Sequence, residues 1–168
     1  MNLKIRNEEK GDIDAIKNVT IEAFLNAPHT GNTEQYIVRD LRNSGALSIS
    51  LVAENQGQIV GHVAISPVTI SDGAEGWFGI GPISVSPNIQ RYGVGSKLMR
   101  SALEALKGLG ASGCVLLGDP AYYSRFGFKA ESNIVLPDVP AEYFQALSFG
   151  SSLPQGHVTY HHAFNAKN

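Results

Sequence analysis

The sequence has little cysteine, no large excess of charge and no long apolar run, and each shortage excludes a class of protein. Cys114 is the only cysteine, so the chain cannot close an internal disulfide, and its apolar neighbours indicate a small core residue. The 13 basic and 15 acidic residues give a net charge of -2, which lacks the basic excess typical of nucleic-acid binding. No apolar stretch approaches the roughly 20 residues that cross a bilayer. We therefore expect a cytoplasmic protein with neither a nucleic-acid nor a membrane partner.

Repeats, low-complexity segments and linkers are also missing, and we expect one domain over residues 1–168. Hydrophobic residues make up 43% of the chain and charged residues 17%, a balance typical of a folded protein with a sizeable core. His157, His161 and His162 do not have the ligand spacing of a zinc site, so we expect no metal.

Hydrophobic periodicity and turn residues predict a mixed α/β fold. A glycine turn at 55–57 predicts an antiparallel hairpin, and the strand–helix–strand unit from 76 to 119 predicts one parallel strand pair. The expected elements, in chain order, are strand 3–7, helices 11–26 and 33–45, two hairpin strands within 47–70, strand 76–86, helix 92–110, strand 112–119, a short helix or turn at 120–128, and late strands within 129–137 and 156–164 separated by a short helix near 140–147.

Gly93 and Gly95 stand directly ahead of a predicted helix, where glycine costs about 0.5–1 kcal/mol relative to alanine. A backbone without Cβ atoms at a helix N-terminus lets an anion lie on unpaired N–H groups, and Arg91 and Lys97 can add positive charge. A dinucleotide fingerprint would need a third glycine where Leu98 stands. From these residues alone, a tight strand-to-helix turn and the pyrophosphate loop of a coenzyme A site remain equally supported.

Two motifs separate these alternatives. Residues 90–95 read Gln-Arg-Tyr-Gly-Val-Gly and follow an Ile-Ser-Val-Ser-Pro segment, and Tyr123 stands four residues ahead of a Gly-Phe pair at 127–128. Together with the order of elements, these motifs resemble the GNAT superfamily of N-acetyltransferases over nearly the whole chain. The block at 117–128 is most similar to a poorly characterised bacterial branch of predicted acetyltransferases.

The resemblance implies an α/β fold with a mixed, mostly antiparallel central sheet, a parallel splayed strand pair and flanking helices. Acetyl-CoA, the implied acyl donor, would lie between the splayed strands, with its pyrophosphate on the backbone N–H groups of residues 91–96. The residues implied for binding acetyl-CoA are Ile83, Ser84, Val85, Gln90, Arg91, Tyr92, Gly93, Val94, Gly95 and Ser96.

The resemblance also implies that a primary amine attacks the thioester directly. The backbone N–H of Val85 would be the oxyanion donor, and Tyr123 would be the general acid for the leaving thiolate. Proton transfer from a tyrosine of pKa near 10 to a thiol near 8.5 is uphill by about 2 kcal/mol, so we expect Tyr123 to act partly as a hydrogen-bond donor. The alternative role of Tyr123 is aromatic packing, which suits Tyr122 better.

No side chain stands out as the general base. Several family members place Glu or His at positions that correspond to Gly79 and Gly81, and the glycines leave room for a bulky acceptor or a water. Glu22, His29 and Glu34 fall in the segment that lines the acceptor site in the family. We retain His29 and Glu34 as weak substrate-binding candidates, although each is more often a solvated surface residue.

Two functions from different classes remain. The first is an acetyl-CoA-dependent N-acetyltransferase that acts on an amine, with a homodimer as one option for its assembly. The second is a non-catalytic acyl-CoA-binding sensor or interaction protein, which the missing base would permit.

Overall fold

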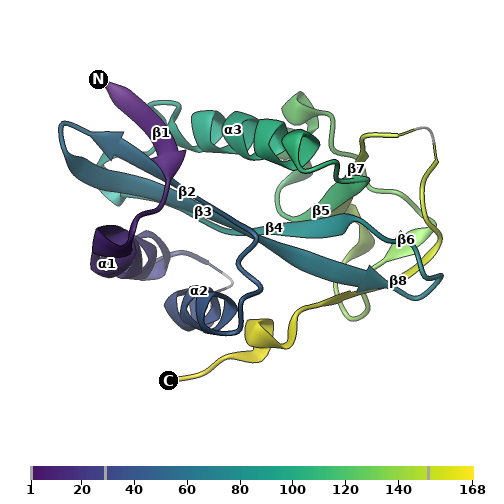
Figure 1. Cartoon of the computed structure of the whole chain (residues 1–168). Helices are drawn as coiled ribbons and strands as arrows, with labels where there is room; N and C mark the ends of the chain where they lie inside the picture. The colour runs from purple at the N-terminus through teal and green to yellow at the C-terminus, as the bar shows by residue number, and fades with distance from the viewer. Residues whose placement is uncertain (1, 29, 151) are drawn as a thin grey trace.

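The computed structural model describes residues 2–28, 30–150 and 152–168, and an eight-stranded sheet lies at its centre (Figure 1). Four strands lie side by side as antiparallel neighbours. They are β1 (Leu3–Asn7), β2 (Ile49–Asn55), β3 (Gln58–Ile70) and β4 (Trp77–Val85). Gln56 and Gly57 join β2 to β3 with φ values of 51° and 79°, the left-handed backbone of a tight hairpin turn. The predicted hairpin is confirmed.

The next strand, β5 (Gly113–Leu117), lies parallel to β4 but follows it for only a short distance. Pairing begins between Trp77 and Gly113 and ends between Gly79 and Val115, although both strands continue further. Beyond the last pair the two strands separate. A mixed, mostly antiparallel sheet with a splayed parallel pair is the fold class that the resemblance implied, and it is confirmed.

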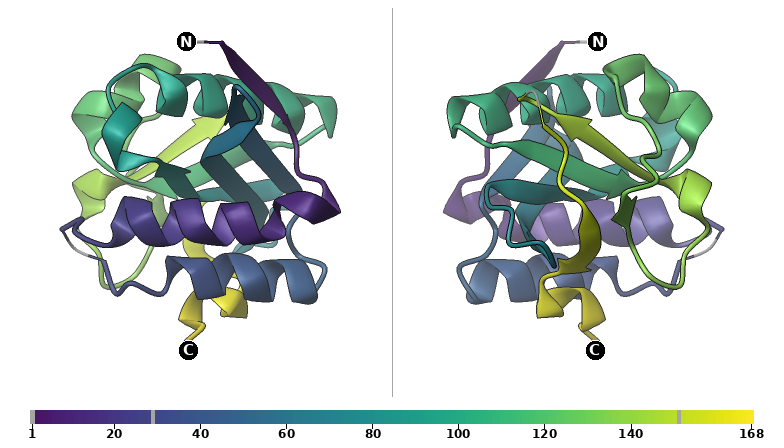
Figure 2. Two further views of the ribbon diagram at one scale, coloured as in Figure 1. Left: turned by 90° about the vertical axis from the view of Figure 1, so that its left-hand side faces the viewer. Right: turned by 90° about the vertical axis from the view of Figure 1, so that its right-hand side faces the viewer.

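Helices cover both faces of the sheet (Figures 1 and 2). Helices α1 (Ile13–Phe24) and α2 (Glu34–Asn43) pack on one face, and α3 (Val94–Gly108) packs on the other. The main core lies between the sheet and α3, because α3 turns one apolar stripe toward the strands. Its buried residues are Ile49, Leu51, Ala53, Val63, Ile65, Ile80, Val94, Leu98, Met99, Ala102, Leu103, Leu106, Cys114, Leu116 and Phe128.

The C-terminal third contains an element that we expected to be helical. Only Ala141–Tyr143 forms a single 3-10 turn, and Phe144–Ser148 is a strand, β7, that pairs antiparallel with β5. The predicted helix near 140–147 is therefore wrong. Local composition favours a helix there, but β5 presents unpaired backbone groups along its free edge, and β7 supplies their partners.

The remaining elements complete the far end of the sheet. Strand β8 (Gly156–Tyr160) pairs antiparallel with the end of β3 and parallel with β6 (Ile134–Val135). The late strand expected at 156–164 ends at Tyr160, and a 3-10 turn follows it. After β5, the short helix α4 (Pro120–Tyr123) begins where the Asp119 carboxylate accepts a hydrogen bond from the Ala121 backbone N–H.

Candidate active site

Two adjoining cavities open where β4 and β5 separate. The first, which we call the Gly93 cavity, has a volume of about 480 Å³ and lies beside the start of α3. The second, which we call the Glu34 cavity, has a volume of about 680 Å³ and extends below the splay toward α2. Phe24, Ile83 and Tyr123 line both cavities. The splay therefore brings a helix N-terminus and a second, larger chamber to one meeting point.

The wall of the Gly93 cavity on the α3 side is formed by the loop that enters the helix. Gln90, Arg91, Gly93, Gly95 and Ser96 line it. Gly93 has a φ of 84° and precedes the first helical residue, so its left-handed backbone directs the loop into α3. The first N–H groups of an α-helix have no partner within the helix, and they carry the positive end of its dipole. This wall can therefore bind an anion through main-chain donors.

Tyr122 and Arg125 also line the Gly93 cavity, and sequence reasoning missed both residues as part of this wall. The Tyr122 hydroxyl lies 3.0 Å from Ser96 Oγ. Arg125 stacks on the Tyr122 ring, with its Cζ 4.2 Å from the ring centroid, and donates from Nε to the Tyr122 carbonyl at 2.8 Å. Arg125 thus adds a second guanidinium to that of Arg91. Arg125 follows Tyr122 by three residues, and this spacing, which places two residues on one face of a helix, could have indicated their contact.

The register of β3 and β4 directs the backbone of Val85 toward the splay. The Ser86 N–H donates to the Val60 carbonyl at 2.8 Å, and hydrogen-bonded and non-bonded pairs alternate along an antiparallel ladder. The N–H of Val85, opposite Gly61, therefore points away from β3. Its carbonyl accepts a hydrogen bond from Gln90 Nε2 at 3.1 Å. This edge of β4 offers main-chain groups to a ligand in the splay.

Tyr123 stands at the junction of the two cavities. Its ring lies so close to Gly118 that a Cβ there would overlap it, and it meets the Tyr122 ring edge-on with centroids 4.9 Å apart. Burial raises the pKa of Tyr123 to about 12, and the neighbouring Tyr122 and Asp119 add to the rise. The hydroxyl is therefore protonated at any ordinary working pH and can donate a hydrogen bond.

The Glu34 cavity is mainly apolar. Among the described residues that line it, Glu34 carries the only charged side chain. Thr30 Oγ1 lies 2.8 and 2.7 Å from the two carboxylate oxygens of Glu34, which holds the group in place. The other lining residues are Phe24, Ile37, Ile80, Gly81, Pro82, Ile83, Met99, Leu116, Leu117, Tyr123, Leu136, Pro137, Tyr160 and Phe164.

The two glycines of β4 differ in the space around them. A Cβ at Gly79 would lie 2.6 Å from the Tyr160 ring, so this ring fills the room that we expected there to remain open. That expectation is wrong because β8 pairs with the end of β3 and brings the Tyr160 ring next to Gly79. Gly81 has open space beside it and lines the Glu34 cavity. Burial raises the pKa of the Tyr160 hydroxyl above its usual range.

Other candidate residues lie apart from the cavities. Ser84 is buried with its Oγ 3.5 Å from Thr20 Oγ1 on α1, and Val94, the first residue of α3, is buried in the main core. Tyr92 is 70% exposed. None of these three side chains lines either cavity, so any role in binding would use the backbone. His29 lies outside the described residues, and the exposed side chain of Glu22 lines neither cavity.

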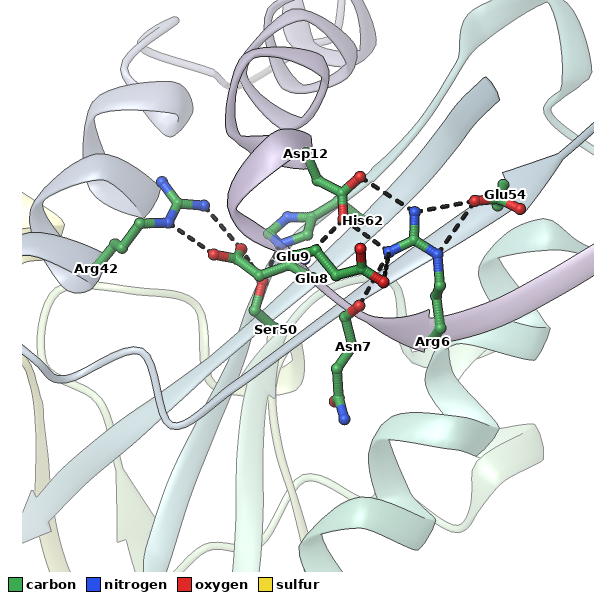
Figure 3. Close-up of polar contacts among 9 residues, drawn as sticks. All are labelled: Arg6, Asn7, Glu8, Glu9, Asp12, Arg42, Ser50, Glu54 and His62. Atoms are coloured by element: carbon green, nitrogen blue, oxygen red, sulfur yellow. Dashed lines mark hydrogen bonds and ion pairs between the residues drawn. The ribbon is translucent and has the colours of Figure 1, made fainter. Parts of the chain in front are cut away.

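A buried polar network, drawn in Figure 3, involves residues that line neither cavity. His62 Nε2 lies 2.8 Å from Ser50 Oγ, which donates to Glu8, and Arg42 makes two hydrogen bonds of 2.8 Å to the same carboxylate. Burial lowers the pKa of His62 to about 4. The imidazole is therefore neutral near pH 7. It lines neither cavity, and through Ser50 it links β3 and β2 to the Glu8–Arg42 ion pair.

A second cluster in Figure 3 is centred on Arg6. Its guanidinium bridges Asp12, at the start of α1, and Glu54 on β2, with N–O distances of 2.7 and 2.9 Å. This cluster fixes the entry to α1. Across the described residues, no group of three or more His, Cys, Asp or Glu side chains is arranged to hold a metal ion. No helix of that part of the chain has the length and apolar character needed to span a membrane.

Comparisons with known proteins agree on one family. Residues 4–130 match the model of an acetyltransferase (GNAT) domain. A GNAT family acetyltransferase from Brucella melitensis, solved in complex with acetyl-CoA, is 48% identical with a TM-score of 0.87, and the match covers 97% of this chain and 98% of that one. The chain belongs to the GNAT family of acetyltransferases.

Within that family, the chain is similar to the uncharacterized N-acetyltransferase YhbS of Escherichia coli K12. The two sequences are 38% identical over 110 residues, and the matched stretch spans 65% of this chain and 66% of the relative. The structure of YhbS from Escherichia coli in complex with CoA matches with a TM-score of 0.90 at 31% identity, covering 100% of this chain and 94% of that one. The predicted resemblance to this superfamily is confirmed.

Proposed function

We propose that this protein transfers an acetyl group from acetyl-CoA to a primary amine. The observation that carries the proposal is the meeting of the two cavities at Tyr123, in the splay between β4 and β5. One cavity has the main-chain donors and guanidinium groups that suit a pyrophosphate, and the other has room for an acceptor. The acetyl-CoA and CoA held by the two structural relatives support the same arrangement here.

Acetyl-CoA would bind with its pyrophosphate on the loop into α3. The N–H groups between Arg91 and Ser96 would donate to the phosphate oxygens, and the guanidinium groups of Arg91 and Arg125 would add charge. The pantetheine amides would pair with the free edge of β4 near Ile83 and Val85. The thioester would then lie beside Tyr123.

The chemical step needs three contributions from the chain. The amine enters from the Glu34 cavity, and holding it against the thioester supplies much of the acceleration. Attack forms the C–N bond and places negative charge on the carbonyl oxygen, which the Val85 N–H would stabilise. The C–S bond then breaks, and Tyr123 would donate a hydrogen bond to the departing sulfur.

The raised pKa of Tyr123 refines this last role. Full proton transfer from a hydroxyl of pKa about 12 to a thiolate, whose acid has a pKa near 8.5, is uphill by about 5 kcal/mol. We therefore assign Tyr123 as a hydrogen-bond donor that stabilises the thiolate. Gly81 offers no side chain as a base, and the open space beside it lets water take the proton of the amine.

A turnover assay tests the proposal. Purified protein is mixed with acetyl-CoA and a panel of amines, and the release of the CoA thiol and the acetylated amine are both measured. We expect stoichiometric thiol and acetylamine. The lack of a side chain at Gly81 that could act as a base suits a second candidate, a non-catalytic acyl-CoA-binding sensor or interaction protein. Saturable binding of acetyl-CoA with no acetylated amine would favour the sensor.

A further inference from the structure

The Glu34 cavity has a composition that selects its occupant. We propose that the acceptor is a primary monoamine with an apolar body and no carboxylate, whose ammonium group binds Glu34. This inference rests on the proposed acetyl transfer, and it adds the substrate class. The cavity volume of about 680 Å³ lies within the usual range for sites that enclose a small organic molecule.

The walls of the cavity come from separate parts of the chain and are apolar on several sides. Phe24 ends α1, Ile37 lies one turn into α2, and Leu136 follows β6. Tyr160 and Phe164 pack edge to face, with ring centroids 4.8 Å apart, and form an aromatic wall. An apolar body that enters this chamber gains by leaving water, whereas a polar chain would lose hydrogen bonds there.

Glu34 supplies the single charge of the described lining, and its orientation is fixed. Thr30 Oγ1 contacts both carboxylate oxygens, and the side chain lies in the first turn of α2, where the helix dipole favours an anion. No cationic side chain among the described lining residues neutralises it within the cavity. A cation from outside is therefore the complementary ligand group.

This charge pattern also excludes acceptors. A free amino acid would bring its own carboxylate into an apolar chamber that already holds one, and like charges disfavour each other. A polyamine would bring two or more ammonium groups, whereas the described lining has one carboxylate. The excess positive charge would then be desolvated without a partner.

Glu34 acts as an anchor rather than as a base. Its carboxylate accepts hydrogen bonds from the ammonium group, and an alkylammonium ion keeps its proton near pH 7. Because a monoamine has one nitrogen, the ammonium group that Glu34 binds must first give a proton to water beside Gly81, and the neutral nitrogen then attacks the thioester. The rate at saturating acetyl-CoA therefore rises with pH between about 7 and 9.

Calorimetry on the protein loaded with CoA tests the inference without turnover. We expect phenethylamine to bind at least about tenfold more tightly than spermidine or phenylalanine. Glu34→Gln weakens phenethylamine about tenfold and leaves the uncharged analogue 2-phenylethanol unchanged. Glu22→Gln, the same change at an exposed position on α1, leaves both unchanged. Thr30→Val provides a second variant that weakens phenethylamine by freeing the carboxylate.

Four results would overturn the inference. The first is tighter binding of spermidine or phenylalanine than of phenethylamine. The second and third concern Glu34→Gln: an unchanged affinity for phenethylamine, or a loss of 2-phenylethanol binding. The fourth is tighter binding of hexanoyl-CoA than of acetyl-CoA, which would place an acyl chain in the cavity. Turnover of phenethylamine is measured in parallel. Binding without acetylation would refute the proposed transfer while the binding specificity stands, and acetylation of spermidine alone would refute only the inference.

Discussion

In the proposed reaction, Tyr123 is the residue on which the chemistry depends most directly. It lines both cavities, and burial keeps its hydroxyl protonated. The sequence singled out this tyrosine because it stands four residues ahead of a Gly-Phe pair. The raised pKa of Tyr123 could not be predicted from the sequence, because the burial that causes it comes from Tyr122, Phe126 and Phe128 packed around the ring.

Replacing Tyr123 by phenylalanine tests this role. We expect Tyr123→Phe to lower kcat by about tenfold to a hundredfold, since the thiolate loses a hydrogen-bond donor, and to leave the Kd of acetyl-CoA unchanged. The exposed Tyr143 provides the matched control, and Tyr143→Phe leaves both quantities unchanged. Steady-state kinetics and calorimetry make the measurement. An unchanged kcat in Tyr123→Phe would contradict the assignment.

His62 makes the stability of the protein depend on pH. Its folded pKa of about 4 lies below the unfolded value near 6.5, so its contribution is complete above pH 6.5 and is lost as the pH falls toward 4. At pH 5 the loss amounts to about 2 kcal/mol of the free energy of unfolding. Urea unfolding at pH 7, 6 and 5 measures it.

His62→Gln removes this pH dependence while keeping a polar group near Ser50. Between pH 7 and pH 5, the free energy of unfolding falls by about 2 kcal/mol less in the variant than in the wild type. His157→Gln, at an exposed position, retains the wild-type profile. Identical profiles for the wild type and His62→Gln would show that the imidazole is not kept neutral by burial.

At the scale of elements, the short pairing of β4 with β5 depends on Gly113. A Cβ there would lie 2.7 Å from the Leu147 carbonyl oxygen on β7 and would also press on the Trp77 ring. We expect Gly113→Ala to lower the free energy of unfolding by about 1–3 kcal/mol through overpacking.

Gly108, near the end of α3, is the control for this prediction because a Cβ there meets no atom within 4 Å. Gly108→Ala raises the free energy of unfolding by about 0.4–1 kcal/mol by restricting the unfolded chain. Urea unfolding of both variants measures the difference. Equal stability of Gly113→Ala and the wild type would mean that the strands can separate at their paired end.

Elements with a strong local pattern were predictable, and elements defined by partners were not. The hairpin turn at Gln56-Gly57 and the helix after Gly93 carry their own signals in glycine and periodic apolar residues. Strand β7 has no such signal, because a free edge of β5 decides its conformation. The packing of the Tyr160 ring against Gly79 could not be predicted for the same reason, since these residues are 81 positions apart and meet only across β3.

At the scale of the whole molecule, the mixed sheet with its splayed strand pair is the fold expected for the family to which the chain belongs. Membership of the GNAT family follows from the match over residues 4–130 and from the structural relatives. The extent of the domain over 1–168 and the cytoplasmic location stay predictions. The central claim is that the Gly93 cavity binds acetyl-CoA, because the catalytic proposal and the acceptor class both depend on it.

Thermal unfolding with and without acetyl-CoA tests that claim most directly. At a concentration of about 100 times its Kd, acetyl-CoA should raise the free energy of unfolding by about 2.7 kcal/mol and the Tm by about 5–10 °C. Gly93→Asp abolishes the rise because its carboxylate would stand where we place the pyrophosphate. Gly93→Asn, a neutral residue of the same shape that tolerates a positive φ, retains part of the rise. An unchanged Tm at saturating acetyl-CoA, or an equal rise in Gly93→Asp and Gly93→Asn, would contradict the account.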